Sequence, residues 1–330
     1  MQNRSMDIPY NGVSEEKIKK ADVVCDGESL ELFAHWIMER YKIHLKKDVL
    51  NAPRPWTDDP LLENYRFTNV RREMDRQTKY LIDNIVNNNK LTLEEKIINN
   101  IMFRCWNVWE SMRLLGGPWT KQELLSGSAL LQARTVYNQV SQDEPRHGWF
   151  TKVFFTSGVK LGMKNLLGVK NFVLGVFDIA QWVISRDIAN QVLNAKSQVE
   201  AFHILKNIPG IANFLGYQIF VDCTYIPEFQ FSENEFTIAG PGCRKGLNRL
   251  IIDDKGLTAE ECVFWLRDNI TKIAPQIDPM KLMVDLPEEE RFLSVMSLEN
   301  CLCEFSKYHR AYHKEGRPKN RYIPFKEDKS

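Results

Sequence analysis

Apolar residues along this chain recur mostly at helical spacing. Leu30, Phe33, Ile37 and Tyr41 fall on one helical face with charged residues between them, and segments 102–112 and 199–205 repeat the pattern. Spacings of three and four residues bring side chains to one side of an α-helix. The β-branched and aromatic runs at 217–223 and 236–239 are short and allow at most a small hairpin or an extended loop. The pattern therefore predicts a mostly α fold.

Clusters of proline and glycine separate the predicted helices, for example at 51–55, 116–118, 209–210 and 240–242. A chain of 330 residues can bury a sizeable core. We expect an N-terminal extension over 1–29, a helical domain of two lobes over 30–322, and a short tail over 323–330.

Charge is balanced over the whole chain but not locally. The 44 Lys and Arg residues against 43 Asp and Glu give a net charge of +1, which excludes a basic field over the whole molecule. Residues 307–326 hold seven Lys or Arg against one acid, a local net charge of +6. We interpret Lys307, Arg310 and Arg317 as contacts to DNA phosphates; the alternative is a solvated helix face.

Cysteine usage and hydropathy indicate the compartment. The seven cysteines are scattered and contain no Cys-x-x-Cys pair, which favours reduced thiols over disulfides or a zinc site. Residues 1–20 are polar, and the most apolar stretch, 172–184, is too short to span a bilayer. We expect a cytoplasmic monomer without membrane contact, metal or cofactor.

The segment 205–220 has the pattern of a helix-hairpin-helix. A helix ends near Pro209, a Pro-Gly-Ile turn follows, and a second apolar helix begins near Asn213. Backbone N–H groups at such a turn can bind a DNA phosphate. Lys206, Gly210, Ala212 and Asn213 are the candidate DNA-binding residues, although Ala212 replaces the usual second glycine. The alternative is a structural turn between two helices.

Asp222 follows at the end of the second helix of this hairpin and is a candidate general base. The alternative is a capping residue at a helix end. Helix-hairpin-helix DNA glycosylases carry their catalytic aspartate further downstream, but residues 236–246 of this chain contain no acid. This absence counts against an ordinary glycosylase.

The loop 240–246, Gly-Pro-Gly-Cys-Arg-Lys-Gly, has the composition of a phosphate cradle. Gly240 and Gly242 permit close approach of the backbone, and Arg244 and Lys245 supply positive charge ahead of a predicted helix. The alternative is a helix-entry turn with an exposed arginine. No Gly-x-x-x-x-Gly-Lys-Ser/Thr motif occurs in the sequence, which disfavours a kinase.

Four motifs in order resemble the α-glutamyl/putrescinyl thymine pyrophosphorylase family. They are 55–60 with 65–78 (Pro-Trp-Thr-Asp-Asp-Pro, then Tyr-Arg-Phe-Thr-Asn-Val-Arg-Arg), the hairpin, the glycine loop, and 302–308. The likeness covers roughly residues 30–322. It implies a helix-hairpin-helix DNA glycosylase-like fold and replacement of a pyrophosphate on 5-hydroxymethyluracil in DNA by an amine or amino acid. A related helical domain is fused to 5-hydroxymethyluracil DNA kinases, and some relatives look like glycosylases.

The resemblance assigns roles to individual residues. A base flipped out of double-stranded DNA needs stacking partners, for which Trp56 and Phe67 are candidates, and Asn69 can read a pyrimidine edge. Asp59 is a further candidate substrate contact. A leaving pyrophosphate needs cations, and an incoming amine needs a base. The candidate cations are Arg72, Arg244 and Lys245, and the candidate bases are Asp222 and Asp75. The alternative for 66–76 is a ladder of ion pairs within one helix.

The sequence thus leaves three functions open. The first is a DNA base-modifying transferase that takes a small amine or amino acid as co-substrate. The second is a glycosylase that excises a hypermodified pyrimidine from phage-type DNA. The third is a DNA-binding protein that retains the scaffold without catalysis.

Overall fold

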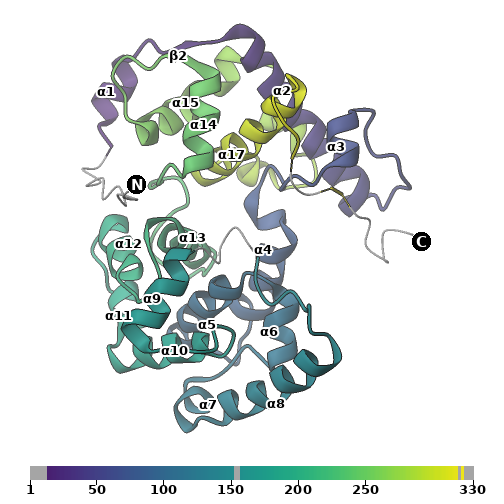
Figure 1. Ribbon diagram of the computed structural model, residues 1–330. Coiled ribbons are helices and arrows are strands. Elements are labelled where there is room, and N and C mark those ends of the chain that lie inside the picture. Colours follow the sequence, from purple (N-terminus) through teal and green to yellow (C-terminus); the bar gives the residue numbers. More distant parts are fainter. Residues whose placement is uncertain (1–12, 152–156, 319–320, 323–330) are drawn as a thin grey trace. The chain divides into compact units, whose positions relative to one another are not determined.

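The computed structural model describes residues 13–151, 157–318 and 321–322. The chain divides into two compact units, one formed by residues 1–70 together with 239–330 and the other by residues 71–238. Regular structure in both units is almost entirely helical (Figure 1), so the prediction of a mostly α fold is confirmed.

The first unit is built around α17, which packs against α14, α15, α2 and α3. Two glycines of α14 face α17, and their missing side chains allow the two backbones to approach closely. Residues 14–25, within the expected N-terminal extension, belong to this packing, because α1 contacts α15 and β1 pairs with β2. The helices of this unit are α1 (Glu15–Lys20), α2 (Gly27–His44), the π-helical turn η1 (Leu45–Val49), α3 (Pro60–Asn64), α14 (Pro241–Leu250), α15 (Ala259–Ile273), α16 (Pro279–Leu282), the 3₁₀ turn η4 (Glu288–Glu290) and α17 (Val295–Tyr312).

A two-stranded antiparallel sheet joins the two chain segments of the first unit. Strand β1 (Val24–Cys25) pairs with β2 (Ile251–Asp253), and Val24 lies opposite Asp253. The amide of Asp26 then donates to the carbonyl of Leu250. The sheet therefore fixes the start of α2 beside the end of α14.

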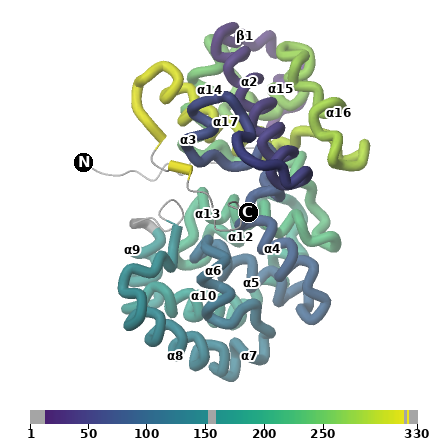
Figure 2. The backbone as a smooth tube through the Cα atoms, turned by 90° about the vertical axis from the view of Figure 1, so that its right-hand side faces the viewer, coloured from purple at the N-terminus to yellow at the C-terminus, as the bar shows by residue number. Residues whose placement is uncertain are grey.

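The second unit is built around α5, which packs against α10, α11, α13 and α6. Figure 2 shows α5 beside α6 and α10. A capping box of Thr92 and Glu95 starts α5, and Asn107 ends it in the left-handed conformation with φ of 51°. The helices of this unit are η2 (Arg72–Met74, 3₁₀), α4 (Arg76–Leu81), η3 (Ile82–Val86, π), α5 (Leu93–Trp106), α6 (Trp109–Leu115), α7 (Lys121–Ser126), α8 (Ser128–Asp143), α9 (Ser157–Leu167), α10 (Gly175–Ser185), α11 (Ile188–Leu193), α12 (Gln198–Lys206) and α13 (Asn213–Cys223).

The structure corrects two local expectations. Residues 217–223 lie inside helix α13, as the helix-hairpin-helix pattern predicts, and not in the small hairpin or extended loop that their composition allows. The helix predicted over 102–112 is broken at Asn107 into α5 and α6. All seven cysteines are free. Within the described ranges, no helix combines the length and apolar character needed to cross a membrane.

Candidate functional site

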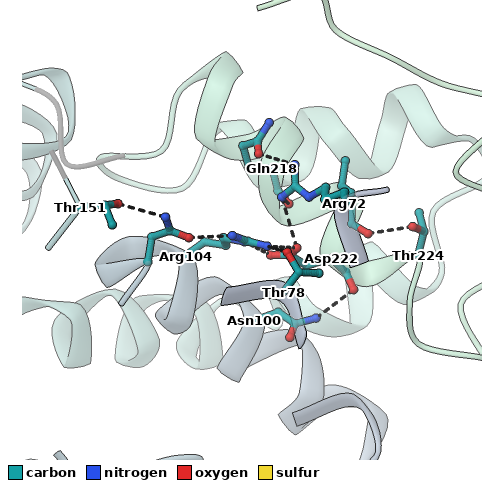
Figure 3. Close-up of polar contacts among 10 residues, drawn as sticks. Arg72, Thr78, Asn100, Arg104, Thr151, Gln218, Asp222 and Thr224 are labelled. Carbon is teal, nitrogen blue, oxygen red and sulfur yellow. Dashed lines mark hydrogen bonds and ion pairs between the residues drawn. The ribbon is translucent and has the colours of Figure 1, made fainter. Parts of the chain in front are cut away.

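Asp222 is the centre of a buried ion-pair cluster in the second unit (Figure 3). Its carboxylate is 0% exposed. The Arg104 guanidinium from α5 contacts both oxygens, with Nη2 donating to Oδ1 at 2.6 Å, and Nη2 of Arg72 lies 3.5 Å from Oδ1. Two guanidinium groups therefore neutralise one carboxylate that water does not reach.

Neighbouring polar groups hold both arginines in place. Arg104 Nη1 donates to the Asn107 side chain at 2.6 Å, and Arg104 Nη2 donates to the Thr78 hydroxyl at 3.1 Å. Arg72 donates to the Gln218 side chain, one turn before Asp222. A general base needs a lone pair that a substrate proton can reach. This geometry favours a structural role for Asp222, and the catalytic role remains a prediction.

The 205–220 segment forms the expected pair of helices, α12 and α13, joined by a turn in which Gly210 has φ of 82°. A Cβ atom built at Gly162 of α9 would overlap the backbone of Gly210, so α9 packs directly on the turn. Lys206 is half-buried, with Nζ 5.7 Å from the centre of the Phe202 ring. Helix α13 begins at Asn213, after Ala212, without a side-chain cap. The DNA-binding role of this N-terminus remains a prediction.

The 240–246 segment is the first turn and a half of α14, with Gly240 as its N-cap. A Cβ atom at Gly242 would overlap the sulfur of Cys303, and one at Gly246 would overlap the carbonyl of Leu302. Both glycines therefore permit the close crossing of α14 and α17, and Lys245 remains exposed.

Carboxylates accept hydrogen bonds from donors at the start of this segment. The amide of Gly240 donates to Glu299 at 3.1 Å, and the amide of Ala239 donates to Glu260 at 3.0 Å. Arg244 pairs with the same Glu260 carboxylate at 2.8 Å. A phosphate would compete with two negative charges, so the geometry favours helix packing over a phosphate cradle.

Asp59 organises a second polar cluster, in the first unit. Its Oδ1 accepts the amides of Leu61 at 2.8 Å and Leu62 at 3.0 Å, which caps α3. Its Oδ2 accepts the hydroxyl of Tyr308 from α17 and lies 3.0 Å from Nε2 of His35 from α2. Three elements of the first unit therefore meet at one carboxylate.

Hydrogen bonds keep the Asp59 carboxylate charged. Burial acts to raise its pKa, but the bonds from Tyr308, the Leu62 amide, His35 and the Leu61 amide outweigh burial and hold the pKa below its ordinary value. Burial and the bond to Asp59 raise the pKa of Tyr308 well above its ordinary value, so the phenol stays protonated as a donor.

The two aromatic residues expected to stack on a flipped base are both buried. Phe67 lies 6.0 Å from the Tyr308 ring, centroid to centroid, and packs in the core of the first unit. The Trp56 indole donates to the Ala52 carbonyl at 2.7 Å, and the cations of Lys47 and Arg54 lie against the Trp56 ring. Neither ring presents an open face, and their stacking role remains a prediction.

Residues 66–76 do not form the helix that an ion-pair ladder would require. Only a 3₁₀ turn and the first residue of α4 are helical there. Asn69 is buried, its carbonyl accepts from Asn300 at 3.2 Å, and Asp75 is the N-cap of α4. The ladder interpretation is therefore wrong, and the roles of Asn69 and Asp75 remain untested.

The basic C-terminal region is described only in part. Lys307 pairs with Glu304 on α17, Arg310 lies near the end of the helix, and Arg317 is exposed. Residues 319–320 and 323–330, which carry part of the predicted basic patch, lie outside the described residues.

Four residues that organise these clusters were not predicted: His35, Arg104, Gln218 and Tyr308. For Asp59, their partner in the first unit, a signal was present in the sequence. An aspartate directly before a proline is the pattern of a helix N-cap, which places Asp59 at the start of α3. Arg104 stands in an apolar segment, which implies a buried acidic partner without identifying it.

The family model for the helical domain of 5-hmdU DNA kinases matches residues 27–317. The chain belongs to this family. One relative, the 5-hmdU DNA kinase of Bacillus phage SP10, is 26% identical over 292 residues, which are 84% of this chain and 44% of that protein. The chain thus spans less than half the length of this relative. No solved structure matches it. The narrower resemblance to the pyrophosphorylases remains a prediction.

Proposed function

We propose that this chain acts on 5-hydroxymethyluracil derivatives in double-stranded DNA as a cytoplasmic monomer, replacing a pyrophosphate on the base with an amine or amino acid. The match to the helical domain of a DNA kinase family over residues 27–317 carries this proposal. The sequence contains no Gly-x-x-x-x-Gly-Lys-Ser/Thr motif to hold ATP phosphates. We therefore propose that the substrate of this chain is the modified base and not ATP.

The reaction is a displacement at the exocyclic methylene carbon. The lone pair of the neutral amine attacks this carbon, the bond between carbon and the pyrophosphate oxygen breaks, and pyrophosphate leaves with the electron pair. The new ammonium group then loses one proton to a base. The residues must supply positive charge for the leaving group and a proton acceptor for the amine.

Exposed groups of the first unit fit a DNA-facing role better than the buried aromatics do. Tyr312 is 52% exposed at the end of α17, and its ring is stacked on Tyr308 with centroids 6.4 Å apart. Stacking on an open aromatic face is a sequence-tolerant way to hold an extruded base. Lys245, Arg310 and Arg317 are cations for the phosphate backbone in this proposal.

The test is incubation with duplexes that carry thymine, 5-hydroxymethyluracil, its pyrophosphate ester or a sugar-modified pyrimidine, with and without a diamine or an amino acid. Nucleoside mass spectrometry should report an amine adduct only from the pyrophosphate ester. Alkali-labile sites without an adduct would replace the proposal with a glycosylase, and binding without any product would replace it with a non-catalytic DNA-binding role.

A further inference from the structure

The imidazole of His35 has the arrangement of an oriented proton acceptor. Its side chain is 48% exposed, whereas the side chain of Asp59, 3.0 Å from Nε2, is 8% exposed. A carboxylate can only accept, so Nε2 carries the hydrogen and Nδ1 is left with a lone pair. Among the described residues no side chain or backbone group is hydrogen-bonded to Nδ1.

Hydrogen bonds fix the Asp59 carboxylate in one position, so it cannot move with the His35 imidazole. Its Oδ1 caps α3 through two amides, its own amide donates to the Thr57 hydroxyl at 3.1 Å, and Tyr308 donates to Oδ2. A fixed, buried carboxylate of this kind sets the tautomer and the orientation of an imidazole and stabilises the imidazolium once it forms.

Three other histidines, His44, His147 and His309, lack this combination. Both ring nitrogens of His44 have carboxylate partners, and both of His309 are engaged by Ser29 and Arg249. His147 has a carboxylate partner at 3.1 Å, but the side chain of that partner, Glu144, is 69% exposed. Such a carboxylate is free to turn away into solvent.

We propose that His35 is the general base of the reaction, with Asp59 as its positioning residue. This inference rests on the proposed function. Nδ1 takes one proton from the attacking amine nitrogen as the new carbon–nitrogen bond forms and pyrophosphate departs with the electron pair of the broken carbon–oxygen bond. The exposed Tyr312, beside Tyr308, then provides the stacking face for the extruded pyrimidine within the same region of the first unit.

Other titratable groups surround this ring and enter any pH profile. The titratable groups in contact with His35 or with its partners are Glu39 of α2, which pairs with Lys42, Asp59 before α3, and Tyr308 and Tyr312 of α17. A pH effect is therefore assigned to His35 only if it disappears with His35 itself.

The experiment compares the wild-type protein with His35→Gln, Asp59→Asn and the control His147→Gln, using pyrophosphorylated DNA and a diamine. His35→Gln should lower kcat about 10²–10⁴-fold, leave the KM for DNA nearly unchanged and leave a pH dependence that the amine alone sets. Its residual rate should rise with pH as the amine loses its proton in solution. His147→Gln should retain the wild-type rate and profile.

A second measurement does not depend on turnover. Nitrogen-15 NMR of the imidazoles should show Nε2–H in His35 of the wild type and Nδ1–H in Asp59→Asn, because the new amide can donate to Nε2. An unchanged tautomer in Asp59→Asn, or wild-type kinetics in His35→Gln, would overturn the role of His35. The absence of any adduct with the wild type would instead overturn the proposed function.

Discussion

Replacing Asp222 with asparagine should destabilise the second unit strongly. The substitution keeps the shape of the side chain but removes a buried negative charge that the Arg72 and Arg104 guanidiniums both contact. The asparagine amide group would also point hydrogen-bond donors at groups that can only donate. Two buried guanidiniums would then lose a negative charge that both of them contact.

The size of the effect follows from complete burial. Removing one partner of a buried ion pair costs about 3–5 kcal/mol, whereas an exposed pair contributes about 0–1 kcal/mol. For a unit of roughly 150–250 residues, each kcal/mol corresponds to about 2–4 °C in melting temperature, so we expect a decrease of roughly 6–20 °C. Asp83→Asn, which removes an exposed partner of Lys79, should change the melting temperature by no more than a few degrees.

Thermal unfolding followed by circular dichroism and calorimetry measures this difference. The paired substitution Asp222→Leu with Arg104→Met should recover part of the lost stability, because it removes opposite charges together. If Asp222→Asn melts within about 2 °C of wild type and yet loses turnover, the structural interpretation is refuted and Asp222 is catalytic.

Three further predictions test other parts of the fold. Gly246→Ala should cost about 1–3 kcal/mol in urea unfolding because its Cβ would overlap the Leu302 carbonyl, whereas Gly27→Ala, with open space around its Cβ, should not destabilise. The pKa of Asp59 is lowered in the folded protein, so the charged carboxylate adds to the free energy of unfolding above the unfolded-state pKa of about 3.9. This stabilisation is lost as pH falls through the folded-state pKa. Asp59→Asn should therefore lose less stability than wild type below about pH 4. Arg310→Ala with Arg317→Ala should flatten the slope of log K against log salt by roughly 0.9 for each DNA phosphate that the variant no longer binds, and an unchanged slope in filter binding would exclude both arginines from the DNA surface.

Helical periodicity predicted the parts of the fold in which one face is buried and the other is solvated. Phe33 and Ile37 are both 0% exposed on α2, as their spacing indicates. The hairpin pattern placed residues 217–223 in a helix, but their periodicity did not, because nearly every residue there is buried and an apolar run buried on all sides has no period to detect.

Most of the site residues that could not be predicted from the sequence interact with partners far away along the chain. Asp222 and Arg104 are 118 residues apart, and nothing in either local pattern specifies the partner. Gly242 illustrates a different ambiguity. Both a phosphate-binding loop and a close helix crossing require a position without a side chain, so the residue type is the same for either role, and only the Cys303 side chain facing it separates them.

The division of the chain has a consequence for its synthesis. Residues 71–238 form one continuous unit, whereas the first unit needs both residues 1–70 and residues 239–330. At about 5–20 residues per second, a ribosome takes on the order of ten seconds or more to make the intervening unit. During that interval α2 has been synthesised, but its partners α14 and α17 have not, so Phe33 on its apolar face lacks the Phe305 ring of α17 that it packs against. Residues 71–238 can thus complete their unit before residues 1–70 meet the segment that completes theirs.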